Sequence, residues 1–176
     1  MADYSKSGFL YEAIKDAQGT IRALDFKANA LLVTMALFVT NLSRFLDAVD
    51  ASRTKRPELA WIVVGLALLG IVTWLVAVTS AFLALRSRVD PAHHISVKGC
   101  AKGTFYDASP GDVSVTRRVT ELPGDEDAAV CELAYEHMKL AYIRGLKVHH
   151  TNGAFDFGFA TLLILLAIWL FSVFSR

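Results

Sequence analysis

The chain has 176 residues, of which 54% are hydrophobic, and its mean hydropathy is +0.42. That hydropathy is high for a soluble domain of this length and is typical of a small membrane protein. The 18 basic and 17 acidic residues leave a net charge of +1, which excludes a general electrostatic attraction for nucleic acid.

Residues 1–27 are predicted to form a cytosolic amphipathic helix, best defined over 8–27. Apolar residues recur there at three- and four-residue spacing, and charged residues occupy the other side. Residues 28–46 continue this helix without a breaker, and we predict transmembrane helix 1 there. The uncharged part of the segment covers only about 24 Å of helix, so Lys27 or Arg44 must extend toward the membrane surface.

Residues 59–85 carry no charge and give the strongest membrane signal in the sequence. We predict transmembrane helix 2 over this range. The segment is longer than a simple span, which favours a tilt or an end that projects from the membrane. The polar residues 47–58 between the two spans are predicted to form an external hairpin.

Residues 86–150 are predicted to form a cytosolic connector followed by a helix. The stretch 86–125 is rich in Gly, Pro, Ser and Asp, which favours a compact connector. The helix after it leads directly into transmembrane helix 3, at 151–176, whose uncharged part covers about 28 Å. The sequence thus predicts an all-α membrane protein with three transmembrane helices, the last continuous with a polar helix that can pass a movement to the bilayer.

The basic residues predict how the chain is oriented. With three spans, the N-terminal arm and the segment 86–150 share one side and together hold thirteen of the 18 basic residues. Basic residues favour the cytoplasmic side of a membrane. We therefore predict a multi-pass protein with its N-terminus and residues 86–150 in the cytoplasm and its C-terminus outside.

No catalytic or metal-binding motif is evident. The sequence has no G-x-S-x-G, S-x-x-K, H-E-x-x-H or Walker spacing, and we predict neither an enzyme nor a catalytic residue. The adjacent histidines at 93–94 and 149–150 lack further ligands at helical spacing, so no metal site is predicted. Cys100 and Cys131 have no metal-ligand spacing either, and we expect two free thiols.

One polar cluster is predicted at the cytoplasmic membrane surface. Asp25 and Lys27 stand just before the first span, and Arg144 and Lys147 stand just before the third. We expect Asp25 to pair with Arg144 or Lys147 and thereby tie two helices together. Two interpretations stay open: the salt bridge only fixes the base of the helices, or the spare cations also bind a ligand phosphate. The candidate ligand-binding residues are Arg22, Asp25, Lys27, Arg144 and Lys147.

Asp156 lies inside the start of the third predicted span. A bare charge at that place is costly, so the carboxylate needs a partner or water. It is expected to act as a helix cap or to line a polar path.

The stretch LDFKANALL at 24–32 resembles the D-x-KA signature of the small transmembrane effectors of the Pycsar system. The later half of the chain also resembles this family, with an acidic turn, a long helix with a lysine near its end, and a final span. The resemblance carries over Asp25, Lys27, Ala28 and Lys147. The chain departs from the family pattern in two places, having Phe-Tyr at 105–106 in place of a Phe-Gly element and Glu-His at 136–137 in place of Gln-Ile. The two-span SLATT-type effectors share the same general plan.

The resemblance implies a bacterial antiphage effector of the inner membrane. A partner cyclase makes a cyclic nucleotide, cUMP or cCMP, and the effector then disrupts the membrane. The ligand is the only small molecule implied, and no cofactor is expected. One protomer has too few spans to enclose a pore, so a homo-oligomer is expected. Two alternatives remain open from the residues alone, a non-enzymatic membrane anchor or scaffold and a small channel subunit.

Overall fold

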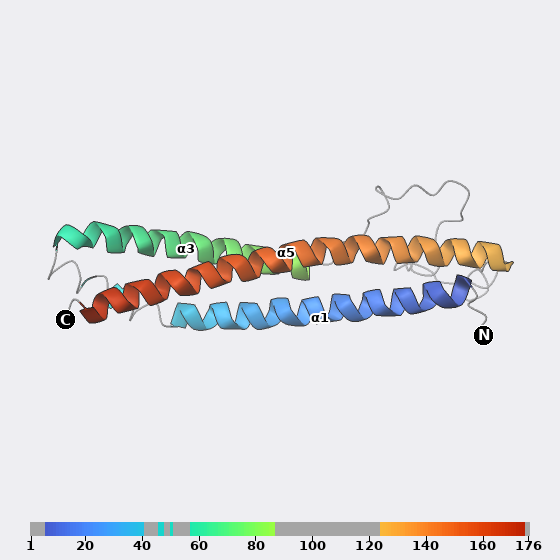
Figure 1. Cartoon of the computed structure of the whole chain (residues 1–176), viewed down its shortest axis with the longest axis horizontal. Coiled ribbons are helices and arrows are strands. Elements are labelled where there is room, and N and C mark those ends of the chain that lie inside the picture. Colours follow the sequence, from blue (N-terminus) through green and yellow to red (C-terminus); the bar gives the residue numbers. More distant parts are fainter. Residues whose placement is uncertain (1–5, 41–45, 48–49, 51–56, 87–123, 175–176) are drawn as a thin grey trace, which may run out of the picture. The chain divides into compact units, whose positions relative to one another are not determined.

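A computed structural model describes residues 6–40, 46–47, 50, 57–86 and 124–174. It contains three long helices, α1 (Lys6–Thr40), α3 (Pro57–Leu85) and α5 (Glu126–Phe174), which are labelled in Figure 1. The described part of the chain is therefore helical, as the sequence predicts. Most of the predicted hairpin and connector, at 47–58 and 86–125, lies outside the described residues.

The chain divides into two compact units. Unit 1 comprises Met1–Arg22 and Arg88–Leu146, and unit 2 comprises Ala23–Ser87 and Lys147–Arg176. Both divisions fall within helices, because α1 and α5 each run unbroken from the polar part of the sequence into the apolar part. With 49 residues, α5 has a length of about 74 Å, which is enough for a membrane span and a long polar extension.

Two of the described helices are long and apolar enough to cross a membrane. They are the segment Trp61–Leu85 and the helix that begins at Glu126, and only 17% and 22% of their apolar windows are buried. Such low burial is unlike the core helix of a soluble protein. The predicted span at 28–46 is not among them, and the described part of α1 ends at Thr40. Three spans and their orientation therefore stay predictions.

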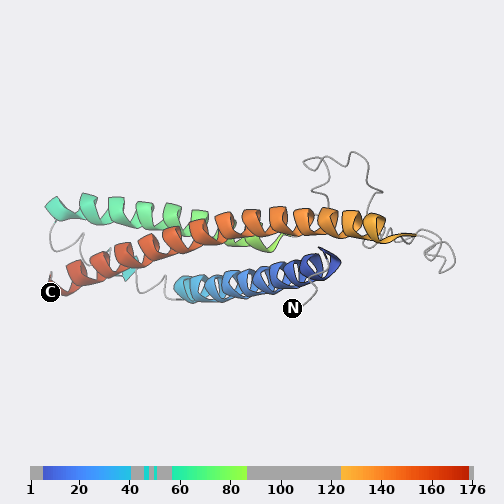
Figure 2. The same ribbon diagram turned by 45° about the vertical axis from the view of Figure 1, so that its right-hand side comes forward.

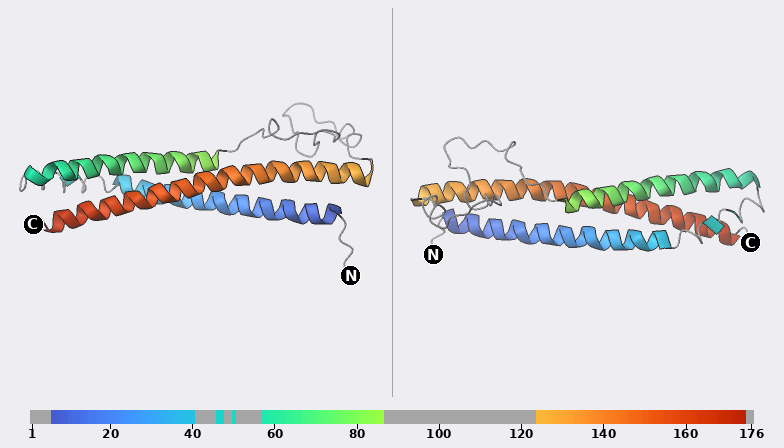
Figure 3. Two further views of the ribbon diagram at one scale, coloured as in Figure 1. Left: turned by 45° about the horizontal axis from the view of Figure 1, so that its top comes forward. Right: turned by 180° about the vertical axis from the view of Figure 1, so that it is seen from behind.

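Unit 2 is packed through a repeat of seven residues. The buried positions of α3 include Val63, Gly70, Ala77 and Ala84, at successive intervals of seven. A repeat of 3.5 residues per turn lets helices wind around one another with a slight left-handed twist. Figures 2 and 3 show the corresponding parts of α3 and α5 side by side.

Small residues bring these helices close together. Ala28, Ala81 and Ala154 come from α1, α3 and α5 and are fully buried, each at 0% exposure. Ala81 and Ala154 join Leu31 and Met35 in one core cluster. Because there is little hydrophobic drive between helices in lipid, close packing of small residues is a main source of association there.

Two of the hydrogen bonds between helices of unit 2 lie among its apolar residues. The Trp74 indole N–H donates to the backbone carbonyl of Met35 over 3.2 Å, joining α3 to α1. The hydroxyl groups of Thr161 and Thr73 lie 2.9 Å apart and join α5 to α3. In a bilayer these polar groups have no water partner, so each needs one inside the protein.

Cys131 corrects one sequence expectation. It takes part in a disulfide, so the prediction of two free thiols is wrong. The side chain is half-buried on α5, and Cys100, which is the chain's other cysteine, lies outside the described residues.

Candidate functional site

The side chain of Lys147 joins three helical segments of unit 2. Its ammonium group pairs with the carboxylate of Asp25 on α1. The same group donates a hydrogen bond of 2.9 Å to the backbone carbonyl of Ala84 on α3. We call Asp25, Ala84 and Lys147 the three-helix junction.

The position of Ala84 explains why a lysine is favoured here. Ala84 lies in the last turn of α3, which ends at Leu85. The last four carbonyl groups of a helix have no partner within the helix, and the helix dipole makes that end negative. Lys147 therefore supplies a hydrogen-bond donor and a positive charge where α3 needs both. Ala84 is only 1% exposed, and its short side chain lets α5 approach this carbonyl.

The junction is buried on one side and open on the other. The side chain of Lys147 is 9% exposed, whereas that of Asp25 is 37% exposed. A buried ammonium group is stable only with partners of opposite charge and good hydrogen bonds. These two contacts use two of its three N–H groups. An acceptor that reaches the ion pair from the exposed side of Asp25 would compete with the carboxylate for the lysine.

The structure places the five predicted ligand-binding residues in two groups. Asp25, Lys27 and Lys147 belong to unit 2, whereas Arg22 and Arg144 belong to unit 1. Of the two predicted partners for Asp25, the structure selects Lys147. Lys27 and Arg22 are exposed and Arg144 is half-buried. Their role in binding a ligand stays a prediction.

Sequence reasoning missed the third member of the junction, the carbonyl of Ala84. Every residue has a carbonyl group, so no residue type marks the one that is used. The signal that was available is the end of α3, where free carbonyls must occur. The span predicted over 59–85 places this end one residue after Ala84.

Unit 1 has a polar interior along α5. Glu132 and Glu136 are 6% and 5% exposed, one helical turn apart. Lys139 pairs with Glu136 over 3.0 Å, and its ammonium group lies 5.0 Å from the centre of the Tyr135 ring. Buried carboxylates need such partners. Glu136 thus forms a local ion pair within α5.

The start of α5 is also fixed by side chains of unit 1. The Asp125 carboxylate accepts a hydrogen bond of 2.7 Å from the backbone N–H of Ala128. Glu126 and Asp127 add negative charge to the first turn, where the helix dipole favours it.

The described residues contain no group of three or more His, Cys, Asp or Glu side chains that could hold a metal ion. The adjacent rings of His149 and His150 pack edge to face with their centres 5.4 Å apart. Within the described part of α5 this pair has aromatic contact and no metal-binding neighbours.

The family model of the Pycsar effector protein domain, PycTM, matches residues 9–174. Because the match covers nearly the whole chain, the protein belongs to the Pycsar effector family. This confirms the resemblance seen in the sequence and supports a role as an antiphage effector with transmembrane character. The comparisons with curated proteins and with solved structures found no significant match.

Proposed function

We propose that this protein is a non-enzymatic effector that senses a cyclic nucleotide, cUMP or cCMP, and then disrupts the bacterial inner membrane as a homo-oligomer. The nucleotide comes from a partner cyclase activated by phage infection. The observation that carries the proposal is α5, a single helix from Glu126 to Phe174, in a chain of the Pycsar effector family. Its polar part belongs to unit 1 and its apolar part to unit 2.

The continuity of α5 supports a mechanical link between sensing and membrane damage. An α-helix has hydrogen bonds at every turn and transmits rotation or displacement along its axis. A change in unit 1 that moves the polar part of α5 therefore also acts on Lys147, where the apolar part begins. Lys147 holds α1 and α3 through Asp25 and the Ala84 carbonyl, so a shift of α5 strains or opens the three-helix junction.

A ligand phosphate is proposed to bind the cationic side chains predicted from the sequence. Lys27 and Arg22 are exposed, and Arg144 is half-buried, so these three side chains are more accessible to a ligand than the buried side chain of Lys147. Lys147 is already paired with Asp25. Phosphate contact with Lys147 therefore requires that it compete with the carboxylate, which would couple ligand binding directly to the junction.

The first test uses the purified full-length protein in liposomes loaded with a self-quenching dye. We expect cUMP or cCMP to trigger dye release and linear UMP or CMP to have little effect. The variants Lys27→Ala and Arg144→Ala should need a higher nucleotide concentration, whereas Lys15→Ala, an exposed lysine on α1, should respond normally. Equal leakage with and without nucleotide would falsify ligand gating.

The second test measures membrane potential in bacteria. Expression together with the partner cyclase should abolish the potential, and expression of either protein alone should preserve it. A membrane anchor or scaffold would leave the potential intact in all three cases.

The proposed orientation places the N-terminus and residues 86–150 in the cytoplasm. The excess of basic residues on that side supports it, whereas a disulfide at Cys131 is typical of an oxidising compartment. A membrane-impermeant amine reagent distinguishes the two orientations of the N-terminal arm. The exposed lysines Lys6 and Lys15 should react in inverted vesicles and stay unmodified in intact spheroplasts, and the reverse pattern would place the arm outside.

A further inference from the structure

The face of α5 that points away from the rest of unit 2 carries a polar strip. It consists of His149, Asn152 and Asp156, all of which are exposed. Their spacing of three and four residues places them on one face of the helix. The buried residue Gly158 is two positions after Asp156, which is a rotation of about 200°. The polar strip is therefore opposite to the side that packs on α1 and α3.

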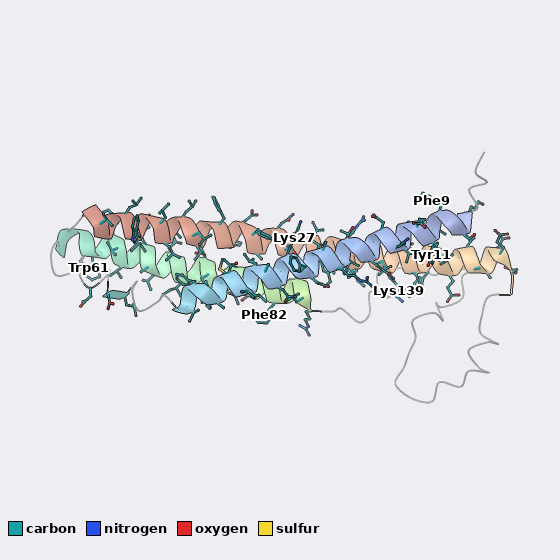
Figure 4. The ribbon with its side chains drawn as sticks, turned by 90° about the horizontal axis from the view of Figure 1, so that it is seen from below. Phe9, Tyr11, Lys27, Trp61, Phe82 and Lys139 are labelled. Carbon is teal, nitrogen blue, oxygen red and sulfur yellow. The ribbon has the colours of Figure 1, made fainter. Side chains whose placement is uncertain are left out.

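The exposed tryptophans of unit 2 indicate the depth of this strip in a membrane. Trp61 and Trp169 are 81% and 59% exposed, and both lie near the end of the unit opposite to Lys147. Figure 4 shows Trp61 at that end, with Lys27 and Phe82 far from it. Exposed tryptophan is typical of the membrane–water interface. Counted back along α5 from Trp169, His149 lies about 30 Å away and Asp156 about 20 Å away.

If Trp169 marks one boundary of a hydrocarbon core about 30 Å thick, the other boundary lies near His149, and Asp156 is roughly 10 Å inside the core. A carboxylate facing lipid at such a place is costly. Among the described residues, the carboxylate of Asp156 has neither an ion-pair nor a hydrogen-bond partner. Because α1 and α3 pack on the opposite side of α5, the described part of unit 2 offers it no polar surroundings. Other molecules can supply such surroundings.

We propose that copies of this chain assemble with their polar strips facing one another around a water-filled, cation-selective pore. This inference rests on the proposed function and names the species that crosses the membrane, namely small cations. Rotational symmetry would arrange the Asp156 carboxylates as a ring. A ring of carboxylates attracts cations and repels anions, and the water in the pore solvates the charge. A second copy is the partner that the strip fits, because each copy supplies the same polar residues at the same depth.

The rest of the same face supplies a gate. Leu163 and Leu170 continue the line of the polar strip toward the end marked by Trp169, and they are 50% and 40% exposed. In the half of the pore nearest Trp169, a lining of leucine side chains can close the pore by excluding water. The polar half then selects the ion and the apolar half opens or closes.

Ion selectivity tests the ring of carboxylates. Currents are recorded in planar bilayers under a gradient of KCl, with cUMP or cCMP added to the purified full-length protein. We expect a reversal potential close to that of K⁺ for the wild type, a shift toward zero for Asp156→Asn, and a change of sign for Asp156→Lys. Asp16→Asn, which neutralises an exposed carboxylate of unit 1, should keep the wild-type value. Unchanged selectivity in Asp156→Asn overturns the inference while leaving nucleotide-triggered leakage intact.

Cysteine cross-linking tests the assembly without relying on nucleotide gating. Asp156→Cys should give disulfide-linked dimers in oxidised membranes, with or without nucleotide. Phe157→Cys should give far fewer, because this exposed neighbour is rotated by about 100°. Equal cross-linking at both positions, or none at 156, contradicts the facing strips. If the wild type gives no current with either nucleotide, the proposed function fails, and the cross-linking result still decides whether the polar strips of neighbouring copies face one another.

Discussion

Replacing Gly158 by alanine tests how closely α5 packs against α1. A Cβ atom at this position would lie 3.0 Å from the methyl carbon of Met35 and 3.3 Å from a methyl carbon of Leu31. The first distance is at the limit that real contacts reach, so the end of Met35 must move. Overpacking of this kind costs about 1–3 kcal/mol. Alanine regains about 1 kcal/mol because it favours the helix over glycine. We therefore expect Gly158→Ala to lower the free energy of unfolding by up to about 2 kcal/mol.

Two other glycines provide matched controls for this prediction. A Cβ atom added at Gly65 on α3 would have nothing within 4 Å, whereas one added at Gly70 would have one contact, with a methyl carbon of Ile164 at 3.3 Å. Gly65→Ala should therefore be neutral or slightly stabilising, and Gly70→Ala should fall between the two. Unfolding by SDS in mixed micelles, followed by circular dichroism, gives the three values. If Gly158→Ala proves at least as stable as Gly65→Ala, the predicted overpacking against Met35 and Leu31 is refuted.

Three further variants are measured against the same wild-type unfolding curve. Lys147→Met should cost about 3 kcal/mol, because it removes the partner of a carboxylate and of the Ala84 carbonyl. Asp25→Asn should cost less, and the double variant should lose less than the sum; additive losses would show that the pair is not coupled. Thr161→Val should cost about 0.6 kcal/mol, the average for a hydrogen bond between membrane helices, and a loss above about 2 kcal/mol would contradict this. Asp125→Ala removes a helix cap worth about 1 kcal/mol and should speed amide exchange only in the first turn of α5; uniform acceleration along the helix would argue against a local cap.

The charge pattern predicted the positions of the long helices well. Charged residues are rare in a membrane span, so the uncharged stretch at 59–85 closely matches α3, and the uncharged residues 157–174 lie within α5. The pairing of Asp25 with Lys147 followed from the same pattern, because the two charges stand just outside neighbouring apolar segments. Their approach in the folded chain needed only that these segments pack together.

Other contacts could not be predicted because their signals are local or absent. The carbonyls of Ala84 and Met35 accept side-chain hydrogen bonds, yet a backbone acceptor leaves no mark in the sequence. Thr161 is one of many hydroxyl residues, and only the packing of α5 on α3 selects Thr73 as its neighbour. The disulfide of Cys131 was missed for a related reason, since spacing along the chain does not report distance in space.

The position of Lys147 within the seven-residue repeat has a consequence for the register of the bundle. The buried positions of α5 follow one another at intervals of four and three, at Lys147, Thr151, Ala154, Gly158 and Thr161. Because this pattern repeats every seven residues, a purely apolar version of it would let α5 slide by one heptad at little cost. After such a slip Ala154 would stand beside Asp25, and both the carboxylate and the Ala84 carbonyl would lose their partner. A single polar residue at a core position specifies one register in this way, at some expense of stability. Lys147 therefore disfavours a stable displaced alignment of α5, so the resting bundle has one alignment to which it can return after α5 moves.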